Sequence, residues 1–176
     1  MRNFKLLLKI AAVPALLFAA SPAFAQINAT FSANSRNGVC YFSVGGPTAP
    51  GTDKPMTLEF SLRVSDGNMG ASIKVNGWPR AQEADPDATK TMTVILDGGR
   101  TNPSRSGGYE SGFNDGLWAG WGPGALSAPL LDLLKTARTA RVEVDGMKLG
   151  PFDLQIKGLA YTSLSQCAER VKAGKE

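Results

Sequence analysis

The feature that most constrains the fold is an alternation of apolar and polar residues that returns along the chain. It is clearest where Met56, Leu58, Phe60, Leu62 and Val64 are separated by single polar residues. Successive side chains of a β-strand point to opposite sides of the sheet, so a period of two predicts a strand with one buried face. The pattern recurs in four other segments, Ile27–Ala33, Cys40–Val44, Ala71–Val75 and Met92–Leu96. Short strands at this spacing favour an antiparallel β-sandwich or barrel.

The last third of the chain combines helical and strand patterns. Apolar residues of the segment 130–134 recur at helical spacing just after Pro129, which predicts a helix. A hairpin is expected next, because residues 141–145 and 152–156 alternate on either side of the turn at Asp145-Gly146. A final helix should follow Gly158, with one apolar stripe formed by Leu164, Cys167, Ala168 and Val171. The expected fold is therefore mainly β, an antiparallel β-sandwich with one or two helices near the C-terminus.

Residues 1–25 have the three parts of a secretory signal peptide. Arg2, Lys5 and Lys9 give a basic start, an apolar run extends over 10–20, and the small residues of 21–25 form a cleavage site of the A-x-A kind. We expect a mature chain that begins at Gln26 and forms a single β-sandwich-like domain over 26–176. Periplasm or full secretion is the expected location.

The charge of the mature chain argues against a nucleic-acid partner. The full sequence has 19 Lys and Arg against 15 Asp and Glu, and loss of Arg2, Lys5 and Lys9 leaves 16 against 15. A formal net charge of +1 does not provide the phosphate-neutralising surface that nucleic-acid binding needs. We also expect no transmembrane segment after residue 25, since no apolar run there approaches the roughly 20 residues of a spanning helix.

Two cysteines, Cys40 and Cys167, are the only thiols of the chain. An exported compartment permits disulfides, and a single pair leaves one intramolecular connection. Cys40 lies on the apolar side of a predicted strand and Cys167 on the apolar stripe of the last helix, so both sulfurs should point into one core. We expect a structural Cys40–Cys167 disulfide; a reactive thiol or a metal ligand is the alternative interpretation.

The absence of histidine from the sequence limits the chemistry. Ser-His-Asp and Cys-His mechanisms and the common zinc sites are excluded, and no phosphate-binding glycine motif is present. We expect no enzyme activity, no metal and no cofactor. A glycosidase that uses only carboxylates remains an alternative, because such chemistry needs two acids across a sugar bond; its candidate residues are Glu59, Asp97, Glu110 and Asp115.

One segment, Gly107–Gly124, concentrates aromatic residues among glycines. We expect it to form a loop, and its candidate binding residues are Tyr109, Phe113, Trp118 and Trp121. Large rigid rings on a loop suit stacking on sugars or anchoring a protein partner. The alternative interpretation is that the rings fold back and cover one end of the sandwich while the glycines permit tight turns. Trp118 and Trp121, three residues apart, would face one way on a short turn.

The C-terminal part of the chain carries a resemblance to a known group. Its elements are the leucine-rich LLDLLKTAR, the strand RVEVDG, Phe152-Asp153-Leu154, Gly158-Leu159 and Cys167. In this order they resemble the end of the invasion-associated locus B proteins and of some type VI secretion-associated periplasmic proteins. The resemblance covers about the last quarter of the sequence and implies a periplasmic β-sandwich used for interaction.

The expected function is that of an exported, non-catalytic binding or accessory protein of the bacterial cell envelope, with a protein or an envelope glycan as partner. A second hypothesis is an inhibitor or immunity-type protein that blocks an exported enzyme with the Gly107–Gly124 segment. The carboxylate glycosidase ranks third.

Overall fold

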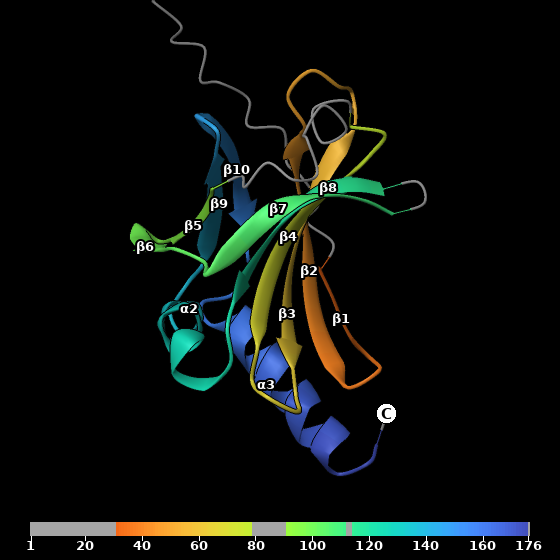
Figure 1. Ribbon diagram of the computed structural model, residues 1–176, viewed down its shortest axis with the longest axis vertical. Coiled ribbons are helices and arrows are strands. Elements are labelled where there is room, and N and C mark those ends of the chain that lie inside the picture. The colour runs from red at the N-terminus through yellow and green to blue at the C-terminus, as the bar shows by residue number, and fades with distance from the viewer. Residues whose placement is uncertain (1–30, 79–90, 112–113, 176) are drawn as a thin grey trace, which may run out of the picture.

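The computed structural model describes residues 31–78, 91–111 and 114–175, and these form two antiparallel sheets with two α-helices near the C-terminus (Figure 1). The expected signal peptide and Phe113 lie outside the described residues. The mainly β fold with C-terminal helices is confirmed, as is the Cys40–Cys167 disulfide.

The larger sheet has six strands in the order β1-β2-β3-β4-β8-β7. Four of them follow one another as a meander, and the β7–β8 hairpin joins this meander through β8, which pairs with β4. The bounds are Phe31–Arg36 for β1, Val39–Thr48 for β2, Pro55–Arg63 for β3, Met69–Asn76 for β4, Arg105–Ser111 for β7 and Asn114–Trp121 for β8.

The smaller sheet has four strands in the order β10-β9-β5-β6. Its bounds are Met92–Leu96 for β5, Gly99–Thr101 for β6, Thr139–Val144 for β9 and Met147–Asp153 for β10. In Figure 1 this sheet lies beside the upper part of the larger one. Apolar side chains of both sheets belong to one buried cluster, so each sheet has an inner face turned to this core and an outer face turned away from it.

The inner face of the larger sheet is formed by the apolar half of each alternating strand. Phe42 and Val44 of β2, Leu58 and Phe60 of β3, and Ile73 of β4 are fully buried. Close packing against the smaller sheet is direct: a Cβ added at Gly46 of β2 would collide with the ring of Phe152 of β10. The alternation in the sequence therefore sorts the core residues to one side, as expected for strands.

Two helices and the turn before them cover the end of the core. A 3₁₀ turn, η1, spans Gly124–Leu126; α2 spans Ala128–Leu134, with Pro129 in its first turn, and α3 spans Leu159–Lys172. The buried hydroxyl of Ser127 accepts a hydrogen bond from the Met69 amide at 3.0 Å and donates to the Trp121 carbonyl at 3.0 Å. This single side chain holds the turn after β8 against the start of β4.

Helix α3 runs across the lower ends of the meander strands and contacts β1, β2 and β3 (Figure 1). Leu164, Cys167 and Ala168 are buried, as their helical spacing predicts. The disulfide joins Cys167 to Cys40 of β2 across 127 residues of sequence, with a Cα–Cα distance of 5.9 Å. The last helix is thus covalently attached to the inner face of the larger sheet.

The second strand of the C-terminal hairpin ends earlier in the chain than the alternation predicts. The alternation of Phe152, Leu154 and Ile156 predicts a strand through residue 156, but β10 ends at Asp153. Gln155 has a φ of 71°, in the left-handed region, so the chain turns there and leaves Ile156 with 68% of its surface exposed. Ile156 therefore does not belong to the core.

Among the described helices, none is long and apolar enough to cross a membrane.

Candidate functional site

The aromatic-rich segment is a β-hairpin, and the expectation of a loop is wrong for most of it. β7 and β8 continue the larger sheet, with Tyr109 opposite Gly116 and Gly107 opposite Trp118. On a strand, residues three apart point to opposite sides. Trp121 accordingly lies in the core with 2% of its surface exposed, whereas Trp118 lies on the outer face with 37% exposed. The expectation that both Trp side chains face one way is therefore also wrong.

The register of the larger sheet places small and polar residues in a row across its outer face. Direct cross-strand pairs connect β2 to β3, β3 to β4, β4 to β8 and β8 to β7. The row consists of Tyr41, Ser61, Gly70, Gly120 and Arg105. Two glycines at its centre leave the backbone uncovered there, with larger side chains on both sides.

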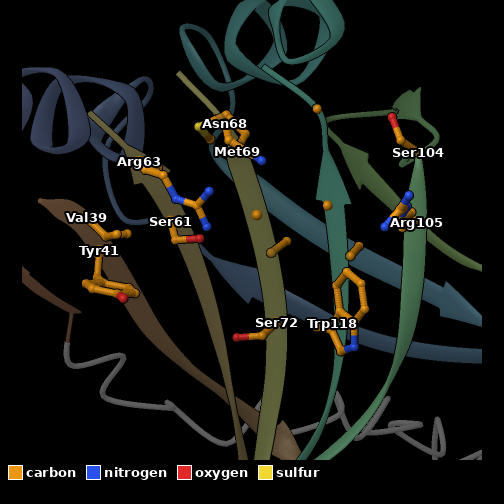
Figure 2. A pocket seen from close by; sticks show the side chains of 15 residues that line it. Val39, Tyr41, Ser61, Arg63, Asn68, Met69, Ser72, Ser104, Arg105 and Trp118 are labelled. Atoms are coloured by element: carbon orange, nitrogen blue, oxygen red, sulfur yellow. The ribbon is translucent and has the colours of Figure 1, made fainter. Parts of the chain in front are cut away.

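This row lies in a hollow of about 690 Å³, here called the outer groove. Figure 2 shows Arg63 and Arg105 on opposite sides of the groove, with Trp118 lower in the view and nearer to Arg105. The side chains that matter for recognition are Tyr41, Ser61, Arg63, Ser72, Arg105 and Trp118. Of the three candidate binding residues that the structure describes, Trp118 lines the groove, whereas Tyr109 and Trp121 do not.

Trp118 lies along the sheet surface because its neighbours are glycines. A Cβ added at Gly107, its partner on β7, would lie 3.1 Å from the indole nitrogen Nε1. A Cβ added at Gly120, two residues further on β8, would lie 3.5 Å from Cζ3 on the other side of the ring. Each edge of the indole is thus close to a glycine. The ring forms an apolar platform at the edge of the groove, with part of its surface in contact with solvent.

Positive charge in the outer groove is not balanced from within. Arg63 has a 56% exposed side chain, and its Nη1 lies 3.5 Å from the Asp66 carboxylate. An ion pair so exposed to solvent contributes little to the stability of the fold. Arg105 is exposed and forms no ion pair with the part of the chain that the structure describes. Among the described residues that line the groove there is no Asp or Glu.

The next part of the outer face is, in contrast, internally neutralised. Lys74 Nζ lies 2.6 Å from Glu59 Oε1, and the Ser43 hydroxyl donates a hydrogen bond to Glu59 Oε2 at 3.0 Å. The Glu59 side chain is only 16% exposed. This three-residue cluster is a satisfied polar network and leaves no free charge for a ligand.

Tyr109 stands beside this cluster and packs over Gly116. A Cβ added at Gly116 would lie 2.7 Å from the Tyr109 ring. Burial raises the pKa of Tyr109 to about 12; the Ser72 hydroxyl opposes the shift, and the negative charges of Glu59 and Asp115 add to it. Although Ser72 is near enough to influence the hydroxyl, the Tyr109 oxygen has no partner of hydrogen-bond geometry among the described residues.

The candidate acids of a carboxylate enzyme lie on different parts of the molecule. Glu59 is on the outer face and paired with Lys74, whereas Asp115 is buried on the inner side of β8. Asp97, between β5 and β6, accepts hydrogen bonds from the Thr139 hydroxyl at 2.7 Å and from the Arg138 and Thr139 amides at 2.8 Å. These bonds, led by that from the Thr139 side chain, lower the pKa of Asp97 below 3.8. The side chain of Glu110 lies outside the described residues.

Within the described ranges, no group of three or more His, Cys, Asp and Glu side chains is arranged to hold a metal ion. The donors available to a ligand in the outer groove are instead hydroxyl and guanidinium groups. Such a set can bind and orient a polar molecule.

Five of the six recognition side chains of the groove were missed by the sequence interpretation: Tyr41, Arg63, Ser61, Ser72 and Arg105. The first two occupy polar positions of strands that the alternation identified, so their outward direction could be predicted. That these side chains lie in one groove with Trp118 could not be predicted, because it depends on the register of five strands.

No protein-family model matches the chain, and neither a curated protein nor a solved structure matches it.

Proposed function

We propose that this chain is an exported, non-catalytic binding or accessory protein of the bacterial cell envelope, and that it holds its ligand in the outer groove. The observation that carries the proposal is the position of Trp118. A large aromatic side chain that is 37% exposed lines the same hollow of about 690 Å³ as two arginines. Such a combination of apolar platform and few polar groups is typical of ligand-binding surfaces.

Export to the periplasm or beyond is the second part of the proposal. It is supported by the signal-like sequence of residues 1–25 and by the disulfide, since disulfides persist in oxidising compartments. The expected result is that mass spectrometry of the protein from a periplasmic or culture fraction finds Gln26 as the first residue. Protein that keeps residues 1–25 and stays in the cytoplasmic fraction would contradict export.

The inhibitor hypothesis required Gly107–Gly124 to act as a rigid protruding loop. Most of this segment is strand within the larger sheet, so the structure offers less support for that hypothesis than for a ligand in the groove. A carboxylate glycosidase has less support still, since Glu59, Asp97 and Asp115 do not share one surface.

The binding proposal is tested by capture. Purified protein is immobilised and exposed to solubilised envelope material containing glycans and proteins, and the bound fraction is analysed for both. The expected result is that wild type captures a specific component and that Trp118→Ala loses most of it. Ile156→Ala is the matched control, because Ile156 is also an exposed apolar residue but lies outside the outer groove. Equal capture by all three proteins would refute a binding role for the groove.

A further inference from the structure

Resting on the proposed function, we infer that the ligand of the outer groove is an acidic oligosaccharide, a chain of sugar rings carrying carboxylate or sulfate groups. The inference is carried by the combination of two unbalanced arginines, one partly exposed indole and an open floor of glycine and serine. Each of these parts selects for a different property of the ligand.

The arginines select for negative charge. Arg63 has only a weak, exposed contact with Asp66, and Arg105 has no ion pair among the described residues, while the groove lining contains no acid. A guanidinium binds a carboxylate or a sulfate through two parallel hydrogen bonds. With a neutral ligand Arg105 would gain no charged partner and Arg63 would keep only its exposed contact with Asp66, whereas an acidic ligand can pair with both guanidinium groups.

The indole of Trp118 selects for a ligand with a flat apolar side. The electron-rich face of an aromatic ring attracts the weakly positive C–H groups of a partner. A sugar ring presents such C–H groups on one side and hydroxyls around its rim. The hydroxyls of Tyr41, Ser61 and Ser72 are placed in the same groove to exchange hydrogen bonds with that rim.

The width of the groove selects for more than one sugar ring. Arg63 lies on β3 and Arg105 on β7, and the sheet order separates these strands by three inter-strand steps. At about 4.8 Å a step this amounts to about 14 Å across the sheet, which is wider than one hexose. The two arginines would therefore contact different units of a chain, and Trp118, on the intervening strand β8, would contact a unit nearer to Arg105.

The floor of the groove argues against an acidic peptide. A peptide binds a sheet by adding a strand at a free edge or by placing side chains in apolar pockets. The middle of the groove lies over β3, β4 and β8, whose neighbours on both sides already use the backbone hydrogen-bonding groups. One side of the groove reaches β7, an edge strand, but a peptide added along that edge would lie beside the groove and not over its floor. The floor exposes Gly70, Gly120 and serines, while the apolar residues that also line it are buried in the core: Met69, Ala71 and Ala119. An oligosaccharide needs neither feature.

The test measures binding of defined oligosaccharides by tryptophan fluorescence and isothermal titration calorimetry at low salt. The probes are a trimer of galacturonic acid, its methyl ester as the uncharged match, a sulfated trisaccharide and hexaglutamate. The expected result is that the acid or the sulfated sugar binds, and that the methyl ester binds at least about tenfold more weakly, because charged hydrogen bonds are lost. Whichever of the two acidic sugars binds more tightly identifies the anionic group.

Two pairs of variants place the binding in the groove. Arg105→Gln should weaken binding by about tenfold, whereas Arg141→Gln, an exposed arginine of β9 outside the groove, should leave it unchanged. Gly120→Ala narrows the floor without steric conflict, since the new Cβ would be 3.5 Å from Trp118; it should weaken binding several-fold. Gly45→Ala adds a methyl group to the same outer face, where no other described segment lies within 4 Å of the new Cβ, and should have no effect. Circular dichroism confirms that each variant is folded.

The outcomes separate this inference from the proposed function. Equal binding of the trimer and its methyl ester would overturn the requirement for charge, while the groove would remain a glycan site. Binding of hexaglutamate alone, lost in Arg105→Gln, would identify an acidic peptide and overturn the saccharide. No binding of any probe overturns the inference too. In that case Trp118-dependent capture from envelope material would still support the proposed function, and its absence would refute both.

Discussion

The two faces of the larger sheet differ most clearly at two tryptophans of the same strand. Trp121 is buried in the core, and its indole nitrogen donates a hydrogen bond to the Thr101 hydroxyl at 2.9 Å. Trp118 is 37% exposed and rests beside glycines. The side chains of the inner face are packed at the density of a protein core. In the outer groove, glycines leave the surface open because they have no side chain. The same residue type therefore contributes to stability on one side and to a binding surface on the other.

The largest difference in stability between the two faces is expected when each indole is removed. Trp121→Ala should lower the free energy of unfolding by about 3–5 kcal/mol, because it leaves a cavity between the sheets and removes the hydrogen bond to Thr101. Trp118→Ala should cost about 1 kcal/mol or less, since the ring is partly in solvent and supports no core residue. Urea unfolding followed by circular dichroism measures both. Equal losses would mean that the outer tryptophan is structural.

The alternation in the sequence predicts the inner face better than the outer one. For β2, β3, β4 and β5 the apolar residues that alternate are largely the ones that the core buries. The disulfide is predicted from the expected export and the single pair of cysteines, and the same local patterns support it, because Cys40 and Cys167 each fall on an apolar stripe. Which side of a strand or helix is buried follows from the pattern within that element, so the local sequence is sufficient to predict its buried residues.

The alternation does not predict the β7–β8 hairpin, because polar and apolar residues do not alternate regularly along its two strands. In β8 the acid Asp115 points inward and Trp118 points outward, the reverse of what alternation requires. In β7, Gly107 and Gly108 occupy opposite faces without any difference in polarity. The outer groove depends further on cross-strand register, which no single segment of sequence records. The fold was therefore more predictable than the site.

The disulfide provides the next test, since it lies in the core on the inner face of the larger sheet. Changing both Cys40 and Cys167 to Ala should lower the free energy of unfolding by about 2–5 kcal/mol, because the unfolded chain regains the freedom of a loop of 127 residues. Urea unfolding of the double variant measures the loss. The affinity of the outer groove for its ligand should be unchanged at low denaturant. A parallel loss of binding would show that the two faces are coupled through β2.

Two adjacent glycines of β2 test the contrast at smaller scale. Gly46→Ala should cost about 1–3 kcal/mol, because the added methyl group collides with Phe152 in the packed core. The methyl group of Gly45→Ala points to the outer face, where no other part of the described structure lies within 4 Å, and should leave stability unchanged or raise it by about 0.5 kcal/mol. Thermal unfolding of the two variants makes the comparison. Similar midpoints would contradict the assignment of one glycine to each face.

The smallest effect is expected at Tyr109, where the outer face is partly closed. At pH 7, Tyr109→Phe should be as stable as wild type or up to about 1 kcal/mol more stable, because the change removes a buried hydroxyl that lacks a hydrogen-bond partner among the described residues. Urea unfolding at neutral pH checks this. A clear loss of stability would mean that the hydroxyl has a partner and that the ring is not held by packing alone.

At alkaline pH the burial of Tyr109 predicts the direction in which the stability of the protein changes with pH. Burial, together with the nearby negative charges of Glu59 and Asp115, raises the pKa of Tyr109 from 10.0 to about 12, although Ser72 opposes the shift. Above pH 10 the unfolded chain releases the phenolic proton while the folded chain still holds it, so the unfolded state binds fewer protons and stability falls with rising pH up to about 12. Wild type should therefore lose stability faster than Tyr109→Phe between pH 10 and 12. Parallel curves would place Tyr109 in water, and the outer face would then be open over Gly116 as it is in the groove.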